Sequence, residues 1–266
     1  MHTPFIEGSQ METETGQARE NAATPPAAPT STFDLYSTLK EQLVAGKYIQ
    51  GSRLRADRLR HNFNCSASAL REVFLRLAAE GFLEAIPQRG FRVPRTSPMT
   101  RNDLVMMRIM LEQQGVTLSI ANGDVDWEAA IVSSHHKLAR IEDTLNNAQK
   151  RAHLLSEWNA AELDFHQALI SACGSPLLIQ THENICNRFR MHLLSDDTLY
   201  GFRDININEH REIMEAALAR DSEKCCQRLA THINKNLTGQ SKYLLAEQRT
   251  PASARVTAVP PANGPD

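Results

Sequence analysis

Proline is nearly absent from the middle of this 266-residue chain. Twelve prolines are present in all, yet between Pro98 and Tyr243 there is only Pro176. Because proline breaks helix interiors, and because few runs alternate apolar and polar residues here, the region is predicted to be an all-α bundle. Pro176 follows Gly174 and Ser175, an order in which glycine ends one helix, serine caps the next and proline takes its first position.

Apolar periodicity divides this region into about six helices. They are expected over residues 100–121, 125–146, 149–173, 176–194, 205–219 and 222–245. Thr100, with Asp103 three residues on, is the expected N-cap of the first helix, and Asp221 is the expected N-cap of the last.

Proline also marks where the ordered domains are expected to end. Eight of the twelve prolines lie in residues 1–30 and 249–266, which are rich in Ala, Thr, Gly and polar residues. This composition predicts disordered tails over residues 1–30 and 248–266. The stretch RVPRTSP, which begins at Arg92, predicts a linker at residues 94–99. A small domain at residues 31–93 and a larger one at 100–247 remain.

The two domains differ in charge. Residues 31–98 contain eleven Lys and Arg against six Asp and Glu, a net charge of +5, whereas the rest of the chain carries −7. A basic small domain indicates a polyanionic partner, although a solvated charged surface explains the charge equally well.

The chain lacks the signals of a membrane or secreted protein. No apolar run approaches the ~18 residues that a membrane span requires, and no basic-then-apolar signal pattern is present at the N-terminus. The five cysteines show no CxxC spacing, which argues against a disulfide framework. We therefore expect a cytoplasmic protein in a reducing environment, with no membrane partner.

The small domain is predicted to contain three helices followed by a β-hairpin. A first helix is expected between Ser31 and Gly46, a short second one over residues 56–63, and a third that Gly81 ends. Ser66 or Ser68 can cap the third helix. The apolar stripe of that helix is Leu70, Val73, Phe74 and Leu77. The alternating runs in FLEAIPQRGFRV predict the hairpin.

This order of elements is that of a winged helix-turn-helix. In that fold a capped helix lies in the major groove of DNA, while the hairpin approaches the phosphates or the minor groove. The alternative from the residues alone is a small helical domain that uses the same stripe for protein packing.

The segment SASALREVFLRLAAEGFLEAIPQRGFRV resembles the recognition helix and wing of GntR-type bacterial repressors. Their pattern is Ser-Arg-x-x-Val-Arg-Glu-Ala-Leu-x-x-Leu-x-x-Glu-Gly, followed by a hairpin with an Arg-Gly tip. This chain departs from that pattern at Ala67, where Arg is usual. In the second helix, Ala56 stands where the family usually has Glu, two residues after the leading Leu. The resemblance implies that Arg71 contacts DNA, with a salt bridge as the alternative role. The expected DNA-binding residues are Arg55, Arg58, Ser66, Ser68, Arg71, Gln88, Arg89 and Gly90.

Three histidines of the bundle stand where leucine would be expected. His166 shares a helix face with Glu162, one turn away. His210 and His232 each lie eleven residues from Asp221, so an antiparallel hairpin of the last two helices brings them level. One carboxylate and three imidazoles inside a bundle suit a divalent metal ion such as zinc, nickel or manganese, which would satisfy groups that are costly to bury unpaired. Any one of these histidines by itself is better explained as a hydrogen-bonded core residue.

The runs WNAAELDFHQALISACGSPLL and INEHREIMEAALARDSEKC resemble the FCD-type effector domain of the fatty-acid-responsive (FadR) GntR subfamily. The resemblance implies that a metal binds at Glu162, His166, His210 and His232 and holds the carboxylate of a small organic-acid effector. Glu162 stands where Asp is usual. Arg108 matches a family arginine that pairs with the effector carboxylate, with an interhelical salt bridge as the alternative. The cluster of Arg188, Arg190 and His192 either borders the effector cavity or is solvated, and Arg188 is the second residue expected to contact the effector.

The sequence therefore predicts a mainly α protein with an N-terminal winged helix-turn-helix and a C-terminal helical bundle. The predicted function is that of a homodimeric transcriptional regulator, a repressor, whose affinity for double-stranded operator DNA changes when a small carboxylate binds. Two alternatives are a metal-dependent hydrolase or lyase with an accessory basic module, and a regulator for which the metal itself is the signal. The enzyme is the weaker alternative because no general base is apparent beyond the expected metal ligands.

Overall fold

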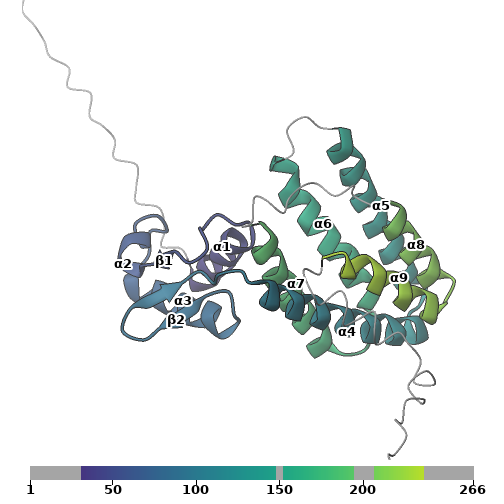
Figure 1. Cartoon of the computed structure of the whole chain (residues 1–266), viewed down its shortest axis with the longest axis horizontal. Coiled ribbons are helices and arrows are strands. Elements are labelled where there is room, and N and C mark those ends of the chain that lie inside the picture. The colour runs from purple at the N-terminus through teal and green to yellow at the C-terminus, as the bar shows by residue number, and fades with distance from the viewer. Residues whose placement is uncertain (1–30, 148–151, 195–206, 237–266) are drawn as a thin grey trace, which may run out of the picture.

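A computed structural model of the chain describes residues 31–147, 152–194 and 207–236. Within these ranges, a small unit of helices and short strands precedes a larger unit made of helices (Figure 1). The predicted fold class is confirmed. The two predicted tails lie outside the described residues, as do residues 237–245 of the last predicted helix.

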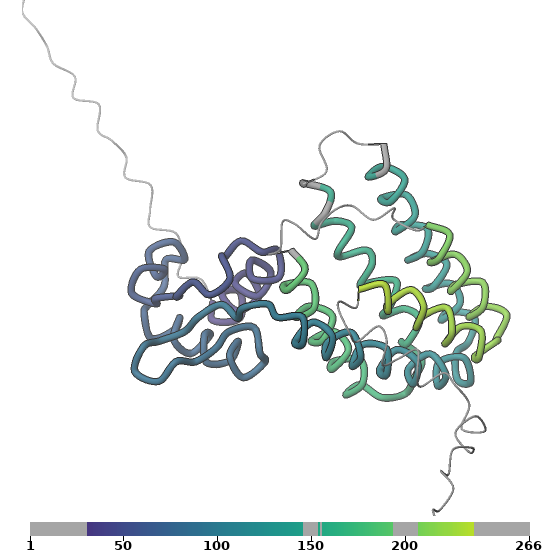
Figure 2. Tube along the Cα trace, in the orientation of Figure 1, coloured from purple at the N-terminus to yellow at the C-terminus, as the bar shows by residue number. Residues whose placement is uncertain are grey.

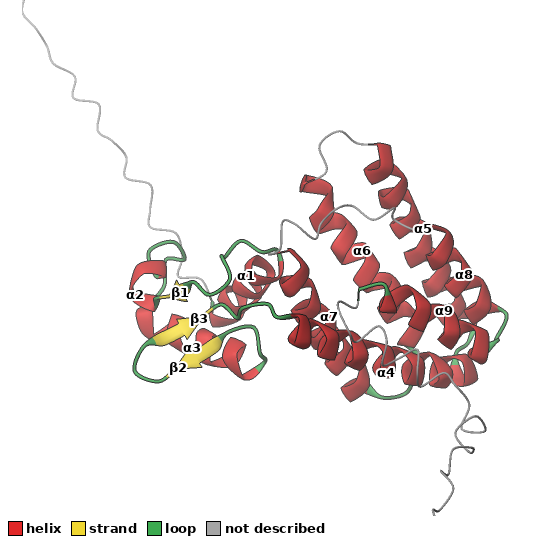
Figure 3. Ribbon diagram, in the orientation of Figure 1, coloured by secondary structure: helices red, strands yellow, loops and turns green. Residues whose placement is uncertain are grey.

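The small unit has the predicted order of helices and strands. Its helices are α1 (Thr32–Val44), α2 (Ala56–Leu59) and α3 (Ala67–Ala79), and its strands are β1 (Arg53–Leu54), β2 (Glu84–Ile86) and β3 (Gly90–Arg92). The strands form an antiparallel sheet in the order β1-β3-β2, at one side of the unit (Figure 3). The predicted hairpin is therefore confirmed, whereas the two-residue strand β1 was not predicted and α2 is shorter than expected.

Capping and burial explain the position of α3. The Ser66 hydroxyl accepts a hydrogen bond from the backbone N–H of Ala69 at 3.1 Å, so Ser66 rather than Ser68 is the N-cap. After the helix the chain turns at Gly81 with φ +84°, a conformation that favours glycine. The apolar stripe of α3 packs with α1 in the core of this unit. The core side chains of α3 are Leu70, Val73, Phe74 and Leu77.

The larger unit contains the six predicted helices. They are α4 (Pro98–Asn122), α5 (Val125–Asn147), α6 (Ala152–Ile170), α7 (Pro176–Leu194), α8 (Ile207–Leu218) and α9 (Ser222–Asn234). The Asp221 cap is confirmed, since its side chain accepts from the backbone N–H of Lys224 at 3.0 Å. The predicted Thr100 cap is wrong: Pro98 takes the first helical position, and Ser97 accepts from the backbone N–H of Thr100 at 3.0 Å.

Helix α7 also packs against the small unit, beside α1 (Figure 2). Its Met191 belongs to the core of the small unit and is 3% exposed. Asn184 donates a hydrogen bond to the backbone carbonyl of Glu80, at the C-terminal end of α3, at 3.2 Å. The guanidinium of Arg188 lies over Gly81, where a Cβ atom would approach its Cζ and Nε to 2.8 Å. In the described ranges, no helix combines the length and apolar character that a membrane span needs.

We expect Ser66→Ala to lower the free energy of unfolding by ~1 kcal/mol, because it leaves the first turn of α3 without its side-chain acceptor. Ser68→Ala is the matched control, since Ser68 is also exposed and lies two residues further along the chain. Urea denaturation followed by far-UV circular dichroism measures both. Equal losses in the two variants would contradict the assignment of the cap.

Candidate metal and carboxylate site

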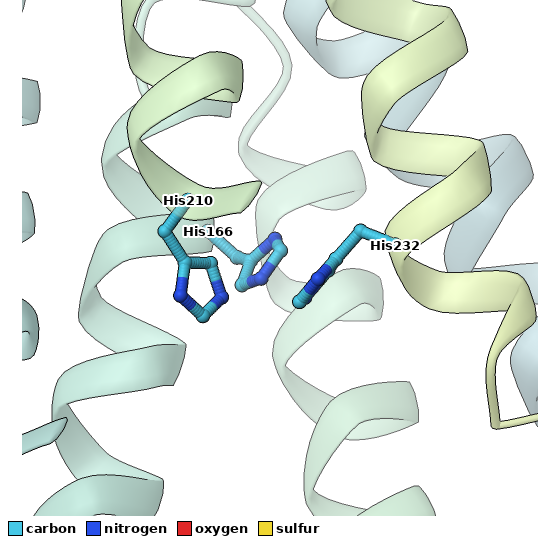
Figure 4. A group of neighbouring side chains, drawn as sticks. All are labelled: His166, His210 and His232. Carbon is cyan, nitrogen blue, oxygen red and sulfur yellow. The ribbon is translucent and has the colours of Figure 1, made fainter. Parts of the chain in front are cut away.

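Three histidines from three helices point toward one another in the bundle (Figure 4). They are His166 of α6, His210 of α8 and His232 of α9, and one ligand atom of each lies within 4.8 Å of the others. The His210 and His232 rings are 4.6 Å apart between centroids, as the antiparallel packing of α8 and α9 predicts. The structure thus brings together three of the four residues expected to ligate a metal.

A carboxylate lies against Nδ1 of each of these histidines. The pairs are His166 with Glu112 at 2.7 Å, His210 with Glu142 at 3.0 Å and His232 with Glu209 at 3.0 Å. At His166 and His232 the carboxylate accepts a hydrogen bond from Nδ1, which favours the tautomer that carries its proton there and leaves the lone pair of Nε2 for a metal ion. Nδ1 of His210 lies close to Glu142 but makes no hydrogen bond among the described residues. Sequence reasoning did not identify these three glutamates.

The unpaired ring nitrogens fit a metal ion. Nε2 of His166 and Nε2 of His210 are buried and have no hydrogen-bond partner among the described residues. Leaving such an atom unsatisfied costs ~1–3 kcal/mol. Burial lowers the pKa of His166 to about 3 although Glu112 acts in the opposite sense, so the ring is neutral, as a metal ligand must be. The three histidines therefore form a donor set that suits zinc or nickel.

Glu162, the fourth expected ligand, lies between two arginines. Its Oε1 accepts from Nη2 of Arg108 at 2.8 Å, and its Oε2 accepts from Nη2 of Arg190. The same Oε1 is 3.4 Å from Nε2 of His166, so the carboxylate lies at the edge of the histidine group. All three charged residues are at most 5% exposed. The arginines are therefore its principal partners in this structure.

Arg108 joins Glu162 to a second buried acid. Its Nε donates to Oε1 of Glu112 at 2.6 Å. Burial alone would raise the pKa of Glu112, but His166 and Arg108 hold that pKa well below its usual value. The pKa of Glu162 is held low in the same way, against burial, by Arg108 and Arg190. Two guanidinium groups and two carboxylates thus form a connected ion-pair network in the interior of the bundle.

The structure separates the two arginines of α7 that follow each other closely in sequence. Arg188, the predicted effector contact, lies over Gly81 at the junction with the small unit. Arg190 instead contacts Glu162 inside the bundle. The helical period offers a signal for this, since His182, Cys186 and Arg190 follow at four-residue intervals and share one face of α7. Arg190, rather than Arg188, is therefore the arginine of α7 that contacts the buried carboxylate of Glu162.

A second group of possible metal ligands lies beside the first. Glu112, His182 and Cys186 have ligand atoms within 4.8 Å of one another and are buried. His182 donates from Nε2 to Oε1 of Glu112 at 3.0 Å, the same oxygen that accepts from Arg108. The guanidinium already supplies positive charge at this oxygen, while Nδ1 of His182 is buried and has no hydrogen-bond partner among the described residues.

The residues expected to contact DNA all lie on the surface of the small unit. Arg71 projects from α3 and makes an exposed ion pair with Asp57 at 3.0 Å. Gln88 and Gly90, at the tip of the hairpin, adopt positive φ angles of 58° and 84°. The exposed set is Arg55, Arg58, Ser66, Ser68, Arg71, Gln88, Arg89 and Gly90.

Comparison with known proteins agrees with this architecture. The family described as bacterial regulatory proteins, gntR family, matches residues 33–93, and the FCD domain matches residues 103–235. A relative described as the uncharacterized HTH-type transcriptional regulator BphR of Paraburkholderia xenovorans is 32% identical over 210 residues, which cover 76% of this chain and 82% of that protein. The chain belongs to the GntR family.

Other relatives of this GntR regulator agree. The HTH-type transcriptional repressor GlaR of Escherichia coli is 28% identical over 211 residues, covering 76% of this chain and 92% of that protein. The solved structure of E. coli McbR/YncC has the same fold, with a TM-score of 0.64 and 23% identity over 82% of this chain and 99% of that one. The protein is a transcriptional regulator with an FCD effector domain, and its family is one of regulators, not enzymes. The hydrolase or lyase alternative is therefore set aside.

We expect Glu112→Ala to lower the free energy of unfolding of this regulator by ~3–5 kcal/mol, because it removes one partner of a buried ion pair. Asp164→Ala is the control, since Asp164 forms a solvent-exposed pair with Lys137 at 2.8 Å. Loss of this exposed pair should lower the free energy of unfolding by ~0–1 kcal/mol. Chemical denaturation of both variants measures the difference. A loss for Glu112→Ala no larger than that of the control would show that Glu112 does not stabilise the network.

Proposed function

We propose that this GntR regulator is a repressor that binds operator DNA as a homodimer and changes its operator affinity when a small carboxylate binds beside a divalent metal in the FCD domain. One observation carries the proposal. Three histidines, each backed by a carboxylate, converge next to two buried arginines. A metal ion and two guanidinium groups together form a binding site for a carboxylate.

In this proposal His166, His210 and His232 hold the metal, with Glu162 as a further oxygen ligand. Imidazole donors suit zinc and nickel, and an oxygen ligand extends the choice to manganese. When bound, the metal supplies a localised positive charge for an oxygen of the effector. Arg108 and Arg190 orient its carboxylate and compensate its charge.

The small unit supplies the DNA contacts in this proposal. The N-terminal turn of α3 enters the major groove with Ser66, Ser68 and Arg71, while Arg89 and Gly90 in the wing approach the backbone. A single module of this size buries too little surface for high specificity, so two copies on half-sites about one helical turn apart are expected. We take residues 31–93 as the DNA-binding domain, 94–99 as the linker and 100–247 as the effector and dimerisation domain.

The contacts of α7 support a physical route between the two domains. Arg190 on one face of the helix pairs with Glu162. On the other side, Asn184 contacts Glu80 and Arg188 lies over Gly81, both at the C-terminal end of α3. A carboxylate that changed the position of Arg190 would therefore act on a helix in contact with the recognition helix. Coupling requires the effector to bind the DNA-competent and DNA-incompetent forms with unequal affinity.

A two-stage experiment tests the proposal. Metabolite carboxylates are first screened for an increase in the melting temperature of the zinc-loaded protein, and compounds that bind are then added to a gel shift with the intergenic DNA upstream of the gene. We expect at least one carboxylate to stabilise the protein and to alter the shift. If chelation alone switched DNA binding, the metal itself would be the signal.

We expect protein purified without chelator to contain close to one metal ion per chain, because unpaired histidine nitrogens converge on one position. Combining His166→Ala with His210→Ala should abolish this content, measured by inductively coupled plasma mass spectrometry. Metal at a hundredfold excess over its Kd should also stabilise the wild type by ~2.7 kcal/mol. His136→Ala is the control, since His136 is exposed on α5. If wild-type protein purified without chelator contained no metal, the proposed metal site would be contradicted.

We expect Arg71→Ala to weaken operator binding by ~1–3 kcal/mol if Arg71 reads a base, and to leave metal and carboxylate affinity unchanged. Fluorescence anisotropy across a salt titration measures the DNA affinity. Arg228→Ala removes the same charge from an exposed pair with Glu212 in the bundle, so it controls for net charge. Equal operator affinity of Arg71→Ala and wild type at every salt concentration would refute the role of Arg71.

A further inference from the structure

The carboxylate of Glu162 accepts hydrogen bonds from the two buried arginines, as the carboxylate of a bound ligand would. One oxygen of its carboxylate accepts from Arg108 and the other from Arg190. The three side chains come from α6, α4 and α7, so the contact is made between helices rather than within one. Carboxylate oxygens clamped by guanidinium groups are the usual form in which arginines recognise a carboxylate ligand. The chain thus supplies its own carboxylate to this position.

Glu162 does not satisfy every hydrogen-bond donor of the two arginines. Nε of Arg190 is buried and has no hydrogen-bond partner among the described residues. Arg108, in contrast, uses its Nε for Glu112. A buried N–H without an acceptor is costly, so the site retains a donor that a ligand with an additional oxygen can satisfy. This favours a ligand with two acceptor groups over a simple monocarboxylate.

Glu162 also has a second set of partners within reach. Its Oε1 lies 3.4 Å from Nε2 of His166, the nitrogen that would ligate the proposed metal ion. The group whose ligand atoms all lie within 4.8 Å of one another contains the three histidines without Glu162. To become a full ligand of the metal, the carboxylate therefore has to move away from the arginines and toward the histidines.

We propose that Glu162 closes the two-arginine site in the ligand-free protein, and that a carboxylate ligand replaces it on Arg108 and Arg190 while Glu162 turns to the metal. This inference rests on the proposed function, because it takes the metal and the carboxylate site as given. The exchange conserves charge: one carboxylate arrives at the arginines as another leaves them. The displaced carboxylate is compensated by the metal, so neither anion is left buried and unpaired.

The exchange couples the two ligands. A metal ion that attracts Glu162 weakens the hydrogen bonds of Glu162 to the arginines. The arginines then become available to the carboxylate ligand. By linkage, a carboxylate on the arginines releases Glu162 and strengthens metal binding by the same factor. Binding of each ligand in the presence and absence of the other is therefore the appropriate measurement.

The test uses the full-length chain with malonate as the probe and isothermal titration calorimetry as the readout. Metal-free wild type is compared with metal-free Glu162→Gln, whose amide competes poorly for guanidinium groups. We expect malonate to bind Glu162→Gln at least tenfold more tightly, and acetate to gain less than malonate. In the wild type, saturating malonate should raise the zinc affinity about tenfold, which corresponds to ~1.4 kcal/mol of coupling.

Two variants control for charge. Asp164→Asn makes the same change in net charge at an exposed position of α6 and should leave malonate affinity unchanged. Glu112→Gln removes a carboxylate from the other side of Arg108. If Glu112→Gln raised malonate affinity as much as Glu162→Gln does, local charge would explain the gain and the specific role of Glu162 would be overturned. Should Glu162→Gln fail to fold by circular dichroism, Glu162→Asp carries the test, because its shorter carboxylate cannot span both arginines.

The outcomes separate this inference from the proposed function. If zinc-loaded wild type binds carboxylates from the screen but Glu162→Gln shows no gain for malonate, the exchange is overturned and the proposed function stands. If no carboxylate binds zinc-loaded wild type, both are overturned, even where malonate binds Glu162→Gln. Carboxylate binding to the wild type, a gain in Glu162→Gln and zinc–malonate coupling together support the exchange.

Discussion

The buried ion network around Arg108 holds the interior of the bundle together. Arg108 on α4 contacts Glu112 one turn along its own helix and Glu162 on α6, and Glu162 in turn contacts Arg190 on α7. Charges removed from water are tolerated only when each has a partner in good geometry. Each helix that contributes to the network is therefore constrained in position by the others, and the histidines on α6, α8 and α9 are set around this fixed centre.

The histidine group and the arginine pair share their carboxylates. Glu112 accepts from Arg108, His166 and His182, so the orientation of the arginine and that of the His166 imidazole depend on one side chain. Glu162 likewise touches both arginines and approaches His166. A change at either position alters the hydrogen bonds available at the other. The histidine group and the arginine pair therefore form one connected site.

Sequence reasoning found the parts of this site that depend on helical period. The three histidines fall on apolar stripes, and the equal spacing of His210 and His232 from Asp221 sets their relative height. The carboxylates behind them were missed, because a glutamate such as Glu142 on a helix has the same local pattern whether it faces solvent or a neighbouring histidine. Arg188 and Arg190 lie in different surroundings for a geometric reason: two residues correspond to a rotation of about 200° around the helix. Ser97 was overlooked as a cap because Pro98 was assigned to the linker.

The boundary between the two domains along the sequence does not coincide with the boundary between their hydrophobic cores. Met191 lies on α7, almost a hundred residues beyond the hairpin, yet its side chain completes the apolar interior of the winged helix. A fragment cut after the hairpin would lack that side chain and would open its interior to water where Met191 now lies. In this regulator, the winged helix-turn-helix is thus incomplete without a residue from the FCD domain.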